Sequence, residues 1–167
     1  MKSCKLSFKK RKPKLIAILT LSFIALMFFG YMDSQQIKTI HKAAETQPNI
    51  YDDYNKNQQP VLMILWYGIF FTSATIYWLF TKDFSESAAI FLVPAIMQSF
   101  GWEDIWFYVL SPFSMTPQMC WFTYPQKIVS WLMNEACVTP KSLILNAFVG
   151  LILAVVIGYV LVSIKKR

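Results

Sequence analysis

Four long runs of apolar residues constrain the fold of this chain more than any other feature of its sequence. They cover residues 15–32, 61–81, 88–110 and 142–164. A helix needs about 20 apolar residues to cross a bilayer core of about 30 Å, and each run is close to that length. Because a backbone in lipid must satisfy its own hydrogen bonds, such runs are expected to be helical. The sequence therefore predicts an all-α, polytopic membrane protein, with residues 1–167 forming one domain built on a bundle of four transmembrane helices.

The composition supports a membrane solvent. Charged residues make up 15% of the chain, whereas soluble domains carry about 25%. The first run could instead be the core of a cleaved signal peptide, because basic residues precede it. Its length, and the lack of a small-x-small cleavage site in the segment Phe28–Met32, favour a retained span.

The basic residues predict the topology. Three of them, Lys165, Lys166 and Arg167, end the chain, and seven of the sixteen precede the first run: Lys2, Lys5, Lys9, Lys10, Arg11, Lys12 and Lys14. Lys and Arg near span ends stay on the cytosolic side. We therefore expect a multi-pass protein of the cell membrane with cytosolic N- and C-termini. Segments 33–60 and 111–141 then lie outside, and residues 82–87 form a cytosolic turn.

The basic N-terminal cluster has two interpretations. It fixes the orientation of the first span, or it also binds anionic membrane lipids, each basic residue contributing about 1 kcal/mol near the surface. No aromatic platform or groove-reading element accompanies it. Nucleic acid is therefore not an expected partner.

Small residues recur at every fourth position of the last run, at Asn146, Gly150, Ala154 and Gly158. This spacing lets helix backbones approach closely in lipid. It predicts close packing within the bundle. The alternative is a homodimer, or contact with another membrane subunit, through Gly150, Ala154 and Gly158.

Glu103 and Asp104 are the acidic residues inside a predicted span. A charge in hydrocarbon is costly, so such residues usually face a protein interior and have a function there. If the helix ends near Leu110, Glu103 lies about 10 Å below that end, within the outer leaflet. Burial favours the neutral form of a carboxylic acid, which can act as a general acid. The predicted ligand-binding companions are Trp66, Tyr67, Trp106, Tyr108 and Asn146.

Two other interpretations of the carboxylate pair remain open. The helix can end early, near Phe100, so that Glu103 and Asp104 cap a loop helix in water. Alternatively, the pair has a structural role and is partnered by Asn146 or Lys127.

The ten residues Glu103–Pro112, EDIWFYVLSP, resemble a segment of small uncharacterised multi-span prokaryotic membrane proteins. Their pattern is Glu-Asp, two residues, two aromatics, Val-Leu and Asn-Pro. This chain has Ser111 in place of the asparagine. The resemblance implies that the carboxylate pair belongs to the family's design, and it implies no activity. The order of acids and aromatics is also similar to that of membrane carotenoid cyclases, in which a buried acid protonates a polyene.

Cys120 and Cys137 both fall on the predicted outer segment, where oxidising conditions permit a disulfide. The loop they would close is short, so a bridge would contribute about 3 kcal/mol. Between them, Ile128, Trp131 and Leu132 have helical spacing and predict a short helix on the outer membrane surface. No Cys-x-x-Cys pair exists, so a redox enzyme is not expected.

We expect neither a metal site nor a cofactor. His41 is the sole histidine, which disfavours zinc, and no phosphate-binding loop or nucleophile elbow is present. Whether the chain is an enzyme stays open. The first hypothesis is a protein that binds a lipid or isoprenoid-like ligand, or a membrane partner, near the outer carboxylate pair. The alternative is a small membrane isomerase or cyclase that uses Glu103 or Asp104 as general acid.

Overall fold

The computed structural model describes residues 2–44, 59–112, 114–115, 117–120, 122 and 126–163, with side chains for all of these except 2–12, 41, 43–44 and 59–60. These residues form helices and no strand, which confirms the all-α prediction. The helices are α1 (Lys2–Ala44), α3 (Gln59–Thr81), α4 (Phe84–Ser99), α5 (Trp102–Leu110), α6 (Ile128–Leu132) and α7 (Pro140–Ser163).

Three of these helices are long and apolar enough to cross a membrane. The candidate spans are Pro13–Ile40 in α1, Val61–Thr81 in α3 and Pro140–Ser163 in α7. Large apolar side chains are exposed along all three, including Leu21, Phe80 and Ile152. A water-soluble monomer rarely exposes apolar surface on this scale, whereas lipid accepts it. The chain is therefore a membrane protein.

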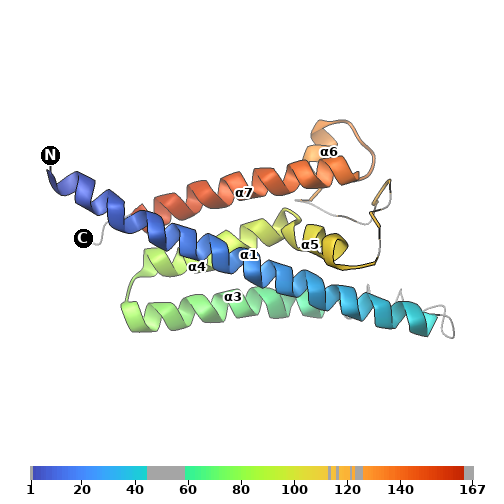
Figure 1. The fold of residues 1–167 in the computed structure, drawn as a ribbon, viewed down its shortest axis with the longest axis horizontal. Helices are drawn as coiled ribbons and strands as arrows, with labels where there is room; N and C mark the ends of the chain where they lie inside the picture. Colours follow the sequence, from blue (N-terminus) through green and yellow to red (C-terminus); the bar gives the residue numbers. More distant parts are fainter. Residues whose placement is uncertain are drawn as a thin grey trace.

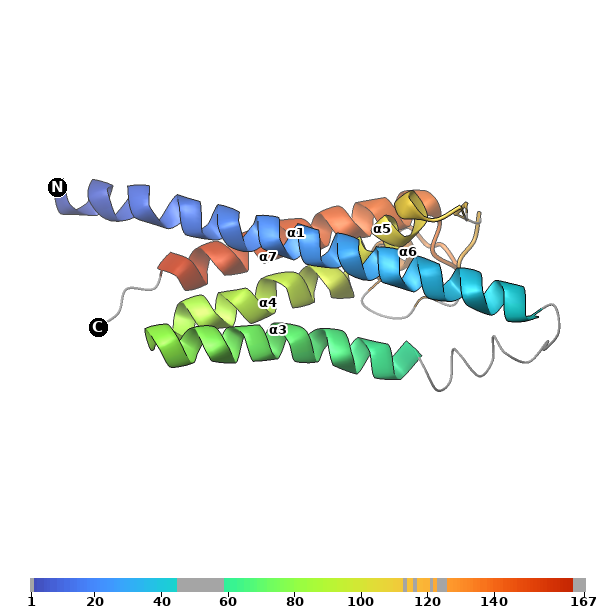
Figure 2. The ribbon, with the colours of Figure 1, turned by 60° about the horizontal axis from the view of Figure 1, so that its bottom comes forward.

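Helix α4 lies in the centre of the molecule and packs against α7, α3 and α1. Figure 1 shows that the start of α1, the end of α7 and the α3–α4 turn lie at one end of the bundle. The C-terminal end of α1 lies at the other end, together with α5 and α6, and Figure 2 gives the same arrangement from a second direction. We call the first the inner end and the second the outer end.

The predicted span over residues 88–110 is corrected by the structure, which divides it into α4 and α5. The α4 helix starts earlier, because the Asp83 side chain caps it by accepting a hydrogen bond from the Glu86 backbone N–H at 3.1 Å. It ends at Ser99, where Gly101 takes a φ of +95°. Glycine adopts this left-handed conformation without steric cost, and it is a common helix stop.

Helix α7 supplies the contacts that hold this break. The buried Asn146 side chain donates a hydrogen bond to the Phe100 carbonyl at 3.1 Å. The indole N–H of Trp102 donates to the Ala147 carbonyl at 2.7 Å. The first bond satisfies a carbonyl that the interrupted helix would otherwise leave unpaired in an apolar environment, and the second pairs the indole N–H of the first α5 residue with α7.

The small-residue face of α7 packs inside the chain. Asn146, Gly150, Ala154 and Gly158 are all buried. A Cβ at Gly158 would come 2.8 Å from Leu15 Cδ1 and 2.9 Å from Val93 Cγ2, so α7 meets α1 and α4 here. A dimer or other subunit contact through this face stays a prediction, and it would have to replace these contacts.

Helix α1 continues past the predicted end of the first span at residue 32. No proline or glycine interrupts residues 32–44, so nothing stops the helix, and Ile40 is buried. The remainder of the predicted outer segment, residues 45–58, lies outside the described residues. The terminal basic residues 165–167 and the side chains of the basic residues up to 12 also lie outside them.

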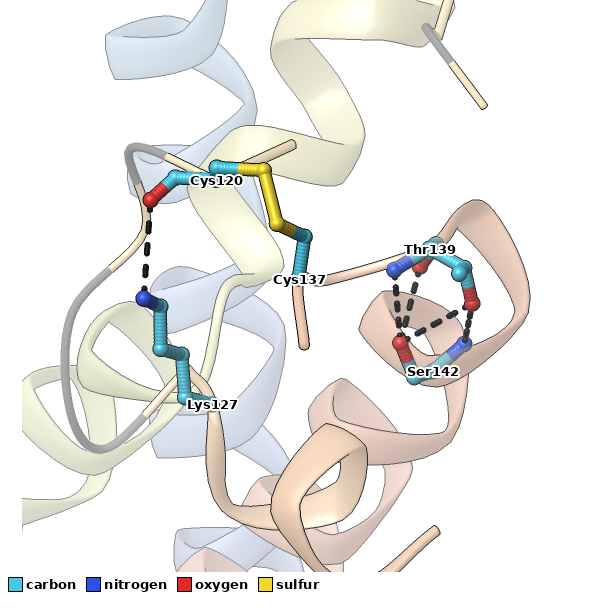
Figure 3. The surroundings of a disulfide bond; sticks show 5 residues. All are labelled: Cys120, Lys127, Cys137, Thr139 and Ser142. Atoms are coloured by element: carbon cyan, nitrogen blue, oxygen red, sulfur yellow. Dashed lines mark hydrogen bonds between the residues drawn. A yellow bond between two sulfur atoms is a disulfide. The ribbon is translucent and has the colours of Figure 1, made fainter. Parts of the chain in front are cut away.

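The segment between α5 and α7 is joined by a disulfide between Cys120 and Cys137 (Figure 3). Next to it, the Met119 N–H donates to the Val138 carbonyl at 2.7 Å. The α7 helix then begins with a reciprocal cap. The Thr139 N–H donates to Ser142 Oγ at 2.8 Å, and the Ser142 N–H donates to Thr139 Oγ1 at 3.2 Å. With Pro140 in the first helical position, this is a strong helix start.

Candidate functional site

The two predicted carboxylates lie at the outer end, in the first turn of α5. Glu103 is buried, and its backbone lies against α1: a Cβ added at Gly30 would come 2.8 Å from the Glu103 carbonyl oxygen. Asp104 accepts a hydrogen bond from Gln126 Nε2 at 3.1 Å. The pair is therefore built into the contact of α5 with α1 and with the segment before α6.

The predicted ligand-binding companions divide between two places. Trp66, Tyr67 and Trp106 belong to or pack against one apolar cluster, which we call the central core and which also contains Leu26, Phe29, Phe70, Val93, Met97 and Ala154. Trp66 stacks on Phe29 with ring centroids 5.2 Å apart. The Tyr67 hydroxyl bonds Ser99 Oγ at 2.7 Å. These two adjacent residues of α3 therefore contact different helices, Trp66 contacting α1 and Tyr67 contacting α4.

The other companions lie on α5 and α7. Tyr108 packs against the apolar cluster of Met119, Phe122, Val138 and Leu143. Trp106 packs against the central core, and its indole N–H is buried with no hydrogen-bond partner among the described residues. Asn146 holds the α4–α5 break. A role for Glu103 or Asp104 as general acid therefore stays a prediction.

A cleft in the inner half of the bundle is a second candidate site. Its volume is about 420 Å³, and we call it the inner cleft. Helices α1, α3 and α4 line it with these residues: Lys14, Ala17, Ile18, Leu21, Ser22, Ala25, Ile69, Phe70, Ser73, Tyr77, Glu86, Ile90 and Pro94. None of the site residues predicted from the sequence is among them.

The cleft opens where α1 and α3 separate. Leu21 and Ile69 stand on its rim, 66% and 50% exposed. Toward the outer end it is lined by Phe70, whose ring contacts Phe29 at a centroid distance of 5.7 Å. From Lys14 to Ala25 the cleft follows α1 for about 16 Å at 1.5 Å per residue. It is thus a long apolar groove open toward the surroundings of the spanning helices.

Three charged or polar side chains meet at its inner end. Glu86, in the first turn of α4, accepts a hydrogen bond from Lys14 Nζ of α1 on one carboxylate oxygen. Its other oxygen accepts from the Tyr77 hydroxyl of α3. The Glu86 side chain is 14% exposed and the Lys14 side chain 52%. We call Lys14, Tyr77 and Glu86 the inner triad.

The hydroxyl groups along the cleft are already engaged as donors. Ser22 Oγ donates to the Ile18 carbonyl at 2.7 Å, and Ser73 Oγ donates to the Ile69 carbonyl at 2.8 Å. Serine in a membrane helix commonly bonds the carbonyl one turn before it. The walls therefore behave as apolar surface, and polarity is concentrated in the inner triad.

Sequence reasoning missed this site, although two signals pointed to it. Glu86 is an acidic residue in the turn between two predicted spans, and Lys14 is the last basic residue before the first span. Both belong to the same predicted membrane level, where opposite charges can pair. The sequence does not show which helices pack against one another. The triad could not be predicted, because it depends on α4 lying between α1 and α3.

The described part of the chain contains no group of three or more His, Cys, Asp or Glu side chains placed to hold a metal ion. No protein family, curated protein or solved structure matches the chain. The resemblance of residues 103–112 therefore stays an expectation, and function must be argued from the geometry.

Proposed function

We propose that this chain is a cell-membrane protein that crosses the bilayer four times and binds one lipid or isoprenoid-like molecule in the inner cleft. One observation carries the proposal: an apolar groove about 16 Å long whose charged side chains, Lys14 and Glu86, lie at one end alone. That distribution is complementary to an amphiphile with one chain and one headgroup. The volume of about 420 Å³ falls within the range of about 300–1,000 Å³ that is usual for small-molecule sites.

The connectivity supports four crossings. The α3–α4 turn lies at the inner end, and α7 starts at the outer end (Figure 1). The chain must travel between these two levels through α4 and α5. Helix α4 has 16 residues and extends about 24 Å, short of a full hydrocarbon core, and α5 continues it. The third crossing in this proposal is therefore the interrupted pair α4–α5.

The basic residues support a cytosolic inner end. Lys14 and Lys82 belong to this end, and the sequence adds the N-terminal cluster and residues 165–167. Positive charge near span ends is retained in the cytosol. The inner cleft then opens into the cytosolic leaflet, and α5, α6 and the disulfide lie on the outer side.

The ligand class is the one expected from the sequence, but the proposed site differs. Glu103 and Asp104 lie at the outer end, whereas the cleft ends at the inner triad. Lipid reaches the cleft directly from the bilayer, since the rim residues Leu21 and Ile69 are exposed between α1 and α3.

Native mass spectrometry of the gently solubilised protein tests this function. We expect one bound amphiphile per chain. Ser73→Trp fills the cleft from α3, so it should weaken the affinity for the amphiphile at least about tenfold, equivalent to about 1.4 kcal/mol, and lower the bound fraction accordingly. Thr72→Trp is the matched control, because Thr72 is also exposed on the same helix but does not line the cleft. Equal ligand occupancy in the two variants, or no ligand in the native protein, would contradict the proposal.

A further inference from the structure

The hydrogen-bonding capacity left over at the inner triad restricts the ligand headgroup. Both oxygens of the Glu86 carboxylate accept hydrogen bonds, one from Lys14 and one from Tyr77. The Tyr77 hydroxyl donates its single hydrogen to Glu86. The hydroxyls of Ser22 and Ser73 donate theirs to backbone carbonyls. A headgroup that donates hydrogen bonds to Glu86 would therefore have to share its oxygens with Lys14 and Tyr77.

Lys14 is different, because its ammonium group carries three donors. Glu86 takes one of them, and the side chain remains 52% exposed at the mouth of the cleft. Lys14 therefore offers the donors that the other polar side chains along the cleft have committed elsewhere. Its bond to Glu86 also fixes the ammonium group at the end of the apolar groove, which reduces the cost of ordering a long side chain when a ligand binds.

Charge acts in the same direction. Lys14 and Glu86 form an ion pair with no net charge, so the field at the cleft mouth is set by its surroundings. Lys82 and Asp83, in the turn before α4, are likewise of opposite sign, so the excess positive charge comes from the six further basic residues that precede Lys14 in the sequence. A surface of this sign attracts anionic groups and repels cationic ones.

We propose that the amphiphile in the inner cleft carries an anionic oxygen headgroup, a phosphate or a carboxylate, which Lys14 binds with the donors that Glu86 leaves free. This inference rests on the proposed function and specifies the ligand of that same site. Glu86 and Tyr77 act as positioning residues, since they hold Lys14 and leave the headgroup to it. The chain of the amphiphile lies along Leu21, Ala25 and Ile69.

Photo-crosslinking in phosphatidylcholine nanodiscs tests the headgroup. The probes are C16 chains that carry the same diazirine and end in phosphate, carboxylate, alcohol or trimethylammonium. We expect half-maximal labelling of α1 and α3 peptides at a mole fraction at least about tenfold lower for the better of the two anionic probes than for the alcohol. Phosphate ahead of carboxylate identifies a phosphate headgroup, and the reverse order identifies a carboxylate headgroup.

Variants separate the two proposals. Lys14→Gln should remove the advantage of the anionic probes over the alcohol, whereas Lys14→Arg should retain it. Lys82→Gln is the control for bulk positive charge, because Lys82 Nζ lies over the Trp78 ring at 5.3 Å and does not line the cleft. It should leave the ranking unchanged.

If all probes label equally and Lys14→Gln has no effect while Ser73→Trp abolishes labelling, the headgroup inference is wrong and the cleft stands. If Ser73→Trp leaves labelling by every probe intact, both proposals are overturned.

Discussion

Gly150 determines how closely the α4–α5 break can approach α7. A Cβ at this position would come 2.3 Å from Phe100 Cβ, a distance at which the backbone or the ring must move. The glycine is thus a packing requirement set by Phe100. The spacing of small residues in the sequence predicts that such contacts exist, but it does not reveal that Phe100 is the partner.

Gly150→Ala should destabilise the fold by about 1–3 kcal/mol, the usual cost of overpacking a close contact. Gly68→Ala is the control, because a Cβ there meets nothing within 4 Å, and alanine favours the helix by about 1 kcal/mol. An SDS titration in mixed micelles, followed by tryptophan fluorescence, measures both. Equal stability of the two variants would show that α7 does not pack closely against Phe100 at Gly150.

Helices α4 and α5 show how far sequence reasoning reaches at the scale of an element. Hydropathy finds the apolar segment correctly, because that property is a sum over residues. The break depends on Gly101 taking a left-handed φ of +95°. It is stabilised by the hydrogen bonds that join Phe100 to Asn146 and Trp102 to Ala147 of α7. A local pattern cannot contain a contact with a helix some 45 residues away, so the early helix end near Phe100 was one alternative among several.

The disulfide offers a prediction for the outer segment. Cys120 and Cys137 are separated by 17 residues, so replacing both by serine should cost about 3 kcal/mol. The loss should fall on the cluster of Met119, Val138 and Leu143, which packs against α5. Faster proteolysis of residues 111–139 measures it, with Cys4→Ser as the control. Ligand occupancy of the inner cleft should not change, and a protease rate equal to that of the native protein would contradict a stabilising bridge.

At the scale of the whole molecule, the sequence predicts the membrane environment and the all-α class. The structure adds which helices pack against one another. Placing a charge or an unpaired backbone group in lipid is costly for each segment separately. The apolar runs and the basic ends can therefore be recognised without knowing how the segments pack. The inner triad requires α1, α3 and α4 to meet at one level. Glu103 and Asp104, in contrast, can be recognised from the sequence alone, because they are charged residues inside an apolar run.

The central claim is that α4 and α5 together cross the membrane, since this crossing sets the inner cleft and the disulfide on opposite sides. Two variants test it with a membrane-impermeant maleimide: each adds one cysteine to a Cys4→Ser background, in which Cys120 and Cys137 are held in the disulfide. Ser85 lies at the start of α4, and Ser114 follows α5. Intact cells that express the protein should allow labelling of Ser114→Cys, and Ser85→Cys should react only after permeabilisation. Labelling of both positions from the same side would contradict the account.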